Sequence, residues 1–188
     1  MSPEPRRHRR DYNTAGHAHE LTFSCYRRLP LLDSDRTRNW LVESISVARV
    51  ELEFDLWAWV FMAEHVHLLV RPRQAEYDIA TIRKAVKEPV GRKAMGYLRR
   101  YRPDWLPKLM RYRGDRTEYL FWASGGGYDR NITEAKTLAS SLDYIHMNPV
   151  KAHFVDRADE WKWSSAGWFV RGDKIPLPVD PIPAEWFA

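Results

Sequence analysis

The sequence has very little cysteine and no long apolar run. Cys25 is its only cysteine, which excludes an intrachain disulfide framework and a cysteine-rich zinc site. No apolar stretch approaches the ~18 residues that a membrane-spanning helix needs. The first ten residues are rich in arginine and lack the apolar segment of a signal peptide. We therefore expect a cytoplasmic protein that has no membrane partner.

The chain does have abundant aromatic and basic residues. Of its 188 residues, 44% are hydrophobic and 13% aromatic, enough for one packed core. The net charge of +5 is unevenly distributed, because residues 83–116 hold twelve Lys or Arg and three acidic residues, a local net charge of +9. This block indicates a polyanionic partner, although a solvated charged face has the same composition.

Three regions are expected along the chain. Residues 1–16 form a basic arm that either is a free end or contacts a phosphate backbone. Residues 17–170 form one domain, and residues 171–188 form a Pro-rich tail. The arginines of the arm that could bind DNA are Arg6, Arg7, Arg9 and Arg10.

The hydrophobic periodicity predicts an α+β fold. Alternating or continuously apolar segments predict strands at 17–26, 55–63, 65–71 and 118–123, and helical spacing predicts helices at 34–49 and 78–101. Pro89 and Gly91 are possible interruptions of the second helix. The order β-α-β-β-α-β is ferredoxin-like, with a four-stranded antiparallel sheet. Residues 124–128, rich in glycine, are expected to be a flexible hinge into a last helix, which begins at Asn131 with Glu134 in a capping box and ends at Pro149.

A His-X-His pair lies in the predicted strand at 65–71. His65 and His67 share one face of that strand, ~7 Å apart at Cα, close enough to bind one metal ion. The alternative is a pair of partly exposed histidines that bind nothing. Two imidazoles are a poor site for a hard cation, so a third ligand is needed, and the side-chain oxygen of Asn148 can supply it.

Tyr144 and Asn148 are four residues apart on the last predicted helix, nearly opposite its apolar stripe. Tyr144 either packs on another surface or is a nucleophile. Its unperturbed pKa of ~10 makes the phenol a weak nucleophile, so it needs a nearby metal ion or cation. Transesterification of a DNA phosphodiester would fit, because its energy is kept in a phosphotyrosine bond. No ATP is then required, in agreement with the absence of a Gly-Lys-Ser/Thr phosphate loop.

The basic block has aromatic residues interleaved with its cations. Lys and Arg neutralise phosphates, and exposed aromatic rings stack on unpaired bases. The alternative is a solubilising face with the aromatics buried. The predicted DNA-binding residues are Arg99, Arg100, Tyr101, Arg102, Trp105, Lys108, Arg111, Tyr112 and Arg113.

Four sequence blocks together resemble a known family. They are residues 62–70 (Met-Ala-Glu-His-Val-His-Leu-Leu-Val), residues 121–132, residues 144–152 (Tyr-Ile-His-Met-Asn-Pro-Val-Lys-Ala) and the Trp-Ser-Ser at 163–165. In these blocks the sequence resembles the IS200-like single-tyrosine HUH transposases, and most closely the REP-associated tyrosine transposases. The likeness covers roughly residues 15–170.

The resemblance implies a ferredoxin-like HUH endonuclease with a C-terminal helix that carries the tyrosine. It implies His65, His67 and Asn148 as ligands of Mg²⁺ or Mn²⁺, and Tyr144 as the nucleophile that forms a 5′-phosphotyrosine. It also implies a substrate of single-stranded DNA with palindromic (REP-like) hairpins. Relatives act as monomers or as homodimers, and such a protein is nucleoid-associated when it is bound to DNA.

Other interpretations stay open. A replication-initiator or relaxase-like HUH nuclease is disfavoured by the block at 144–151. A domesticated, catalytically silent hairpin-binding protein would keep the same residues without turnover. A zinc-binding structural domain is disfavoured by the missing soft ligands.

Overall fold

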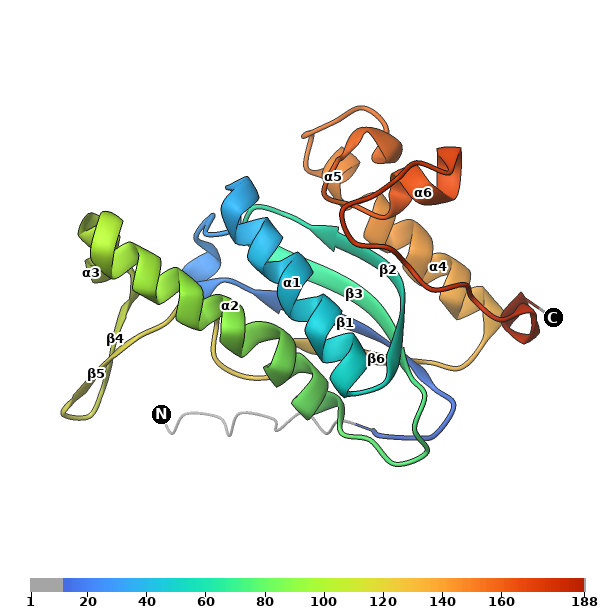
Figure 1. The fold of residues 1–188 in the computed structure, drawn as a ribbon, viewed down its shortest axis with the longest axis horizontal. Helices are drawn as coiled ribbons and strands as arrows, with labels where there is room; N and C mark the ends of the chain where they lie inside the picture. The colour runs from blue at the N-terminus through green and yellow to red at the C-terminus, as the bar shows by residue number, and fades with distance from the viewer. Residues whose placement is uncertain (1–11, 188) are drawn as a thin grey trace, which may run out of the picture.

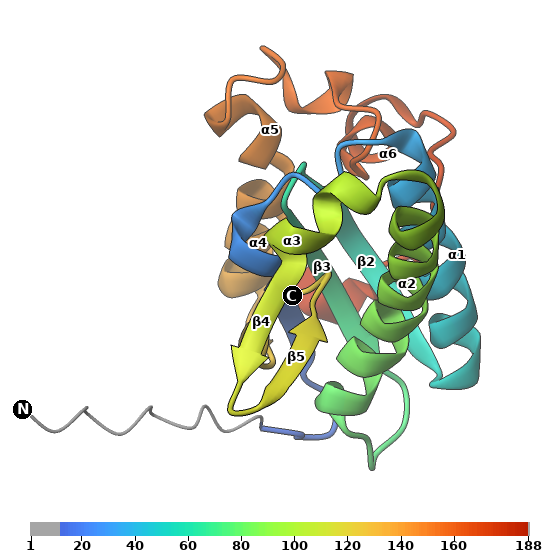
Figure 2. The same ribbon diagram turned by 90° about the vertical axis from the view of Figure 1, so that its left-hand side faces the viewer.

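The computed structural model describes residues 12–187 and has the predicted α+β architecture. Its main sheet is antiparallel and four-stranded, with the order β2-β3-β1-β6. Figure 2 shows this sheet between α4 on one side and α1 and α2 on the other. The strands are β1 (Ala18–Ser24), β2 (Phe54–Phe61), β3 (His65–Pro72) and β6 (Tyr128–Ile132). The order of strands and helices confirms the ferredoxin-like prediction.

Successive residues of β3 point into two different hydrophobic cores, one on each side of the sheet. Val66, Leu68 and Val70 pack beneath α1 and α2 in the larger core, whereas Leu69 lies in the smaller core beneath α4. His65 and His67 share the α4 face, because successive strand residues point to opposite sides. Strand β1 pairs with β3 so that Thr22 lies opposite His67 and Ser24 opposite His65.

The two helices of the larger core each begin after an N-cap side chain. α1 (Asp35–Glu51) has Ser34 as N-cap, and α2 (Ile79–Tyr101) has Asp78. Pro89 does not interrupt α2. A proline cannot donate to the carbonyl four residues earlier, but here the Ser44 hydroxyl from α1 contacts the carbonyl of Ala85 at 3.2 Å and that of Val86 at 2.8 Å. A side chain from the neighbouring helix thus satisfies the carbonyl that Pro89 leaves without its helical partner.

The fourth strand is the main correction to the sequence prediction. Residues 118–123 do not complete the sheet, because β5 (Arg116–Tyr119) pairs only with β4 (Met110–Arg113) in a separate two-stranded ribbon. This ribbon projects from the end of the domain (Figures 1 and 2). Phe121 and Trp122 are buried in the larger core instead. The fourth strand is β6, which pairs with β1.

Residues 124–128 therefore do not lead directly into the last helix. Gly127 has φ +75°, and a Cβ there would lie 2.1 Å from the Thr22 carbonyl oxygen. Only glycine allows the chain to approach β1 this closely. The glycine-rich segment is therefore needed for the close contact between its backbone and that of β1, just before β6 begins. The last helix, α4 (Ala135–His146), has Glu134 rather than Asn131 as N-cap. Asn131 belongs to β6, and its side chain donates to the Tyr12 carbonyl.

Short elements complete the domain. Asn148 is the first residue of α5 (Asn148–Lys151) rather than the last residue of the helix before it. The extended C-terminal segment follows the edge of β2, where the Asp180 backbone N–H donates to the Leu56 carbonyl. Within residues 12–187, no helix is long and apolar enough to cross a membrane. The remaining elements are η1 (Tyr26–Arg28), η2 (Pro103–Trp105), α3 (Leu106–Leu109), η3 (Ala158–Glu160), α6 (Ala166–Arg171) and η4 (Ala184–Phe187).

Candidate active site

The two histidines of β3 lie side by side on the sheet face that α4 covers. Their ring centroids are 4.8 Å apart, with the ring planes at 80°. His67 is almost fully buried and His65 is partly exposed. The arrangement follows directly from the strand, because residues two apart share a face.

A neighbouring side chain occupies the Nδ1 atom of each histidine. The carboxylate of Glu64 accepts a hydrogen bond from His65 Nδ1 at 2.8 Å, which leaves the lone pair of this ring on Nε2. His67 Nδ1 lies 2.8 Å from the hydroxyl oxygen of Thr22 on β1. Partners of this kind fix the orientation of metal-binding histidines in proteins.

His67 keeps one buried nitrogen without a protein partner. Its Nε2 atom is buried and accepts or donates no hydrogen bond within the described part of the chain. Burial, with smaller contributions from the nearby His65 and Arg28, lowers the pKa of His67 to about 3. The ring is therefore neutral at physiological pH, the form in which an imidazole binds a metal ion.

Helix α4 and the start of α5 bring Tyr144 and Asn148 to the same place. The Tyr144 ring centroid lies 5.4 Å from that of His67, nearly perpendicular to it. The Asn148 amide donates to the Tyr144 carbonyl at 2.7 Å, and its side chain lies beside the His67 ring. Its side-chain oxygen is thus available beside the histidines. Lys151, one turn further on, places its ammonium 4.8 Å from the centroid of the Tyr144 ring.

The residues present fit a divalent cation with three protein ligands. His65 and His67 offer Nε2 atoms, and Asn148 offers an oxygen. Within residues 12–187 there is no cluster of three or more His, Cys, Asp or Glu side chains that could form a different metal centre. A set of two nitrogens and one oxygen leaves coordination positions for water and phosphate oxygens.

A pocket of about 480 Å³ opens between Tyr144 and the sheet. The buried carboxylate of Glu20 accepts a hydrogen bond from Ser141 of α4 at 2.8 Å, which ties the helix to the sheet beside the site. Most of these lining residues were not predicted from the sequence. The alternation along β1 was the available signal, because it places Glu20 and Thr22 on the histidine face. The lining residues are Glu20, Thr22, His67, Tyr128, Arg130, Ser140 and Tyr144.

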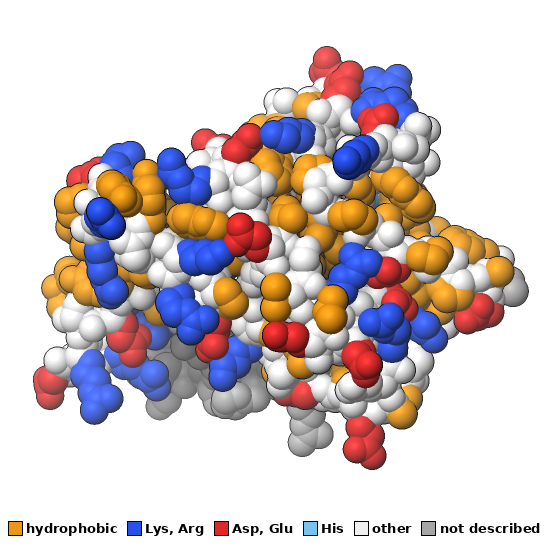
Figure 3. Space-filling view, in the orientation of Figure 1, with side chains coloured by type: hydrophobic (Ala, Val, Ile, Leu, Met, Phe, Trp, Pro, Cys, Tyr) orange, Lys and Arg blue, Asp and Glu red, His pale blue; other side chains and the backbone are white. Residues whose placement is uncertain are grey.

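The predicted DNA-binding residues lie apart from this pocket. They occupy the end of α2, the η2–α3 turn and β4, at the end of the molecule where basic side chains gather in Figure 3. Tyr101 and Tyr112 are well exposed, at 57% and 70%. Arg102 pairs with Asp104, and Arg111 with Glu118. The predicted arm residues Arg6, Arg7, Arg9 and Arg10 lie outside the described residues.

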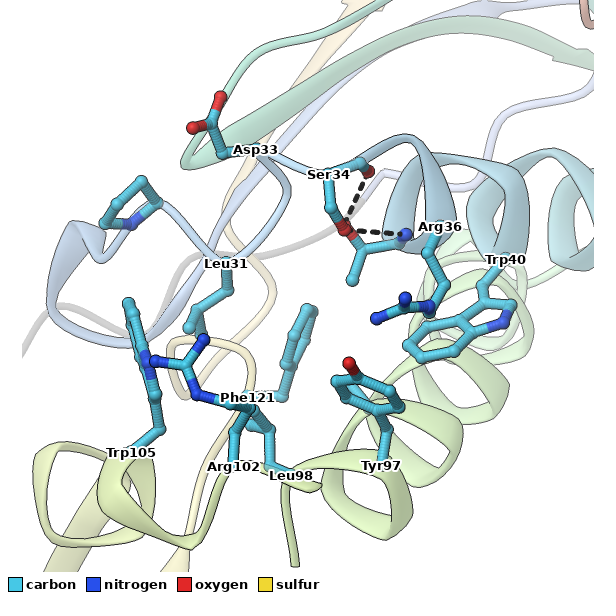
Figure 4. Close-up of a pocket in the computed structure, with 13 residues that line it drawn as sticks. Leu31, Asp33, Ser34, Arg36, Trp40, Tyr97, Leu98, Arg102, Trp105 and Phe121 are labelled. Atoms are coloured by element: carbon cyan, nitrogen blue, oxygen red, sulfur yellow. Dashed lines mark hydrogen bonds between the residues drawn. The ribbon is translucent and has the colours of Figure 1, made fainter. Parts of the chain in front are cut away.

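A second pocket, of about 340 Å³, lies between the start of α1 and the end of α2. Two of the predicted DNA-binding residues, Arg102 and Trp105, line it (Figure 4). The guanidinium of Arg36 lies 4.2 Å from the centroid of the Tyr97 ring on its wall. This pocket is therefore lined by aromatic rings and guanidinium groups, the same two kinds of side chain that alternate in the basic block.

Comparisons with known proteins agree with the motifs. No protein-family model matches the chain. A putative REP-associated tyrosine transposase from Haemophilus influenzae (strain Rd) is 28% identical over 158 residues, which cover 76% of this chain and 80% of that protein.

The structure of a REP-associated tyrosine transposase bound to a REP hairpin matches with a TM-score of 0.67 and 20% identity, over 94% of this chain and 93% of that one. A putative transposase from Deinococcus radiodurans R1 matches with a TM-score of 0.45 and 18% identity, over 73% of this chain and 95% of that one. In sequence and in fold, the chain is thus similar to REP-associated tyrosine transposases, as its motifs predicted.

Proposed function

We propose that this protein is a metal-dependent, single-strand DNA endonuclease and strand transferase that cleaves and rejoins DNA beside REP-like hairpins. The observation that carries the proposal is the convergence of Tyr144 and Asn148 on His65 and His67, from segments about eighty residues apart. A phenol beside a neutral His67 and a second histidine has the composition that phosphotyrosine chemistry needs.

In the proposed reaction the Tyr144 phenolate attacks the phosphorus of a DNA phosphodiester. A bond forms between the phenolic oxygen and phosphorus, and the bond to the 3′-oxygen breaks. The 3′-oxygen leaves as a hydroxyl after it takes up a proton, and the 5′ end stays on the enzyme as a phosphotyrosine. A 3′-hydroxyl can later attack this ester, which rejoins the DNA and restores the phenol.

Lys151 supports the nucleophile in this scheme. A phenol has an unperturbed pKa of ~10, so its anion needs stabilisation at neutral pH. The Lys151 ammonium lies over the Tyr144 ring, so a positive charge stands beside the proposed nucleophile.

Mg²⁺ or Mn²⁺ would be held by His65, His67 and Asn148. When bound, such an ion polarises a phosphate oxygen and stabilises the charge that develops on it. The support for this assignment is the buried, unpartnered His67 Nε2 atom and the carboxamide beside it.

The proposed substrate is single-stranded DNA that folds into a palindromic hairpin. The solved relative with the same fold was bound to a REP hairpin. Residues 83–116 carry a local charge of +9, and cations of this density neutralise phosphates. Because Tyr144 reaches the histidines within one chain, a monomer would contain the whole site; a homodimer is the alternative.

The test is a covalent-adduct assay. The full chain is mixed with end-labelled single-stranded hairpins from palindromes that flank its gene, in Mg²⁺ or Mn²⁺. We expect a metal-dependent nick and a protein–DNA adduct, both lost in Tyr144→Phe and in His65→Ala/His67→Ala. Tyr128→Phe is the matched control, since Tyr128 lines the same pocket, and it should still form the adduct. Hairpin binding without any nick or adduct would instead indicate a catalytically silent hairpin-binding protein.

A further inference from the structure

A turn with two consecutive strained arginines lies next to the histidine pair. In η1, directly after β1, Arg27 has φ 53° and Arg28 has φ 56°. This left-handed region is sterically unfavourable for residues other than glycine, and Asn tolerates it better than Arg. Such strain persists where the surroundings impose it, and it concentrates at functional sites. Neither arginine takes part in the proposed reaction as described above.

The turn is held against the β2–β3 connection by backbone hydrogen bonds. The Cys25 N–H donates to the Glu64 carbonyl at 2.8 Å, and the Leu32 N–H donates to the Ala63 carbonyl at 2.9 Å. On its other side, the Tyr26 N–H donates to the Phe121 carbonyl at 2.8 Å. The turn therefore has a fixed position relative to His65, the first residue of β3.

The Arg28 side chain is linked to His65 by two routes. Its Nη1 donates to the Ser24 hydroxyl at 3.1 Å, and Ser24 is the cross-strand partner of His65. Its Nη2 lies 3.6 Å from the Glu64 oxygen that accepts from His65 Nδ1. The carboxylate is thus shared between the guanidinium and the imidazole.

Arg28 nevertheless keeps hydrogen-bonding capacity for a ligand. Its side chain is 64% exposed, and the 3.6 Å separation from Glu64 is longer than a hydrogen bond. A guanidinium has five N–H donors, and only one of them is used by Ser24. Arg27 differs from Arg28 in the direction of its side chain. Its guanidinium lies over the Tyr26 ring, 5.0 Å from the ring centroid.

We propose that Arg28 binds a phosphate of the DNA strand that enters the His65–His67 site. The choice of DNA as the ligand rests on the proposed function. The planar guanidinium fork matches two oxygens of a phosphodiester. The shared carboxylate of Glu64 then couples phosphate binding to the orientation of His65. The strained turn is retained because it positions the Arg28 side chain beside Glu64 and the histidine pair.

The first test separates strain from binding. Arg28→Asn is compared with Arg27→Asn, the matched control with the same backbone conformation. Asn is the better residue for a left-handed backbone, so we expect neither variant to be less stable than the wild type, with a rise in melting temperature of roughly 2–4 °C. Only Arg28→Asn should lose affinity for a fluorescein-labelled single-stranded hairpin with unpaired flanks, by about tenfold in EDTA. Arg28→Lys should be intermediate, because it keeps the charge but loses the fork.

Two further readouts identify the phosphate. The slope of log Kd against log salt should fall by about 0.7–0.9 in Arg28→Asn alone, as expected for one lost phosphate contact. Neutral methylphosphonates placed one at a time in the unpaired flanks should include one position that weakens the wild type but not Arg28→Asn.

Three results would contradict one or both proposals. Equal affinities and salt slopes for the two Asn variants would overturn the phosphate site. A wild type that binds the hairpin but forms no adduct would refute the proposed reaction, while these binding measurements still decide the role of Arg28. A wild type without any affinity for the hairpin would overturn both proposals.

Discussion

The two ring nitrogens of His67 have different surroundings, because Thr22 contacts Nδ1 and leaves Nε2 as the nitrogen without a partner among residues 12–187. The hydroxyl of Thr22 contacts Nδ1 at 2.8 Å, while Nε2 is buried without a protein partner in the described chain. Without the hydroxyl, the ring could rotate or change its tautomer. A residue on β1 thus controls the chemistry of a residue on β3, through the register that places them opposite each other.

Thr22→Val should therefore weaken metal binding without unfolding the protein. Valine has nearly the same shape as threonine but cannot hydrogen-bond His67, and loss of such an outer contact typically lowers metal affinity about 10–100-fold. Isothermal titration with Mn²⁺ measures the effect, with Thr117→Val on the exposed β5 strand as the control. Equal Mn²⁺ affinities of Thr22→Val and wild type would show that Thr22 does not orient the ligand.

At the scale of elements, the β4–β5 ribbon is the feature that the sequence did not predict. Arg111 and Arg113 lie opposite Glu118 and Arg116, so these four side chains share one face of the ribbon. Arg113 and Arg116 are exposed near its tip. A two-stranded ribbon fits the major groove of duplex DNA, such as the stem of a hairpin.

Charge reversal at the tip tests the predicted DNA-binding block. Arg113→Glu/Arg116→Glu should weaken hairpin binding by at least about tenfold and reduce the salt slope by about two, one unit for each lost phosphate contact. Fluorescence anisotropy between 50 and 200 mM salt measures both quantities, and Lys174→Glu, an exposed residue of the C-terminal segment, is the control. If the double variant behaves like Lys174→Glu, the ribbon does not contact DNA.

At the scale of the whole molecule, the buried His67 and the partly buried His146 link stability to pH. Burial lowers the pKa of His67 to about 3 and that of His146 to about 4. In the unfolded chain both groups have a pKa near 6.5. Between these values the unfolded state binds protons that the folded state does not, so the unfolding free energy falls as the pH decreases below about 6.5.

The expected decrease is up to about 1.4 kcal/mol per pH unit for each histidine, between pH ~6 and ~4. Urea denaturation at pH 7.5, 6.0 and 5.0 measures it. His146→Gln, which keeps a polar partner for the Ser165 hydroxyl, should have a shallower pH dependence than the wild type. An unfolding free energy that is constant from pH 7.5 to 5.0 would contradict the burial of both neutral rings.

The sequence by itself determined the fold class, the first three strands, the helices α1 and α2, and the pairing of His65 with His67. These features follow from local patterns: a period of two or 3.6 residues, a capping side chain, or a spacing that places two residues on one face. The roles of His65, His67, Tyr144 and Asn148 in catalysis stay predictions, and the packing of α4 that brings Tyr144 to His67 is a tertiary contact.

Only the tertiary structure decided which segment becomes the fourth strand. Residues 118–123 have the apolar and aromatic composition of a strand, yet Phe121 and Trp122 fill the larger core, while the more polar segment at 128–132 pairs with β1. The choice depends on Gly127 approaching the Thr22 backbone, a contact between residues about a hundred positions apart. The same holds for the contacts of Thr22 with His67 and of Arg28 with Glu64, because a local pattern carries no information about a partner that distant in the chain.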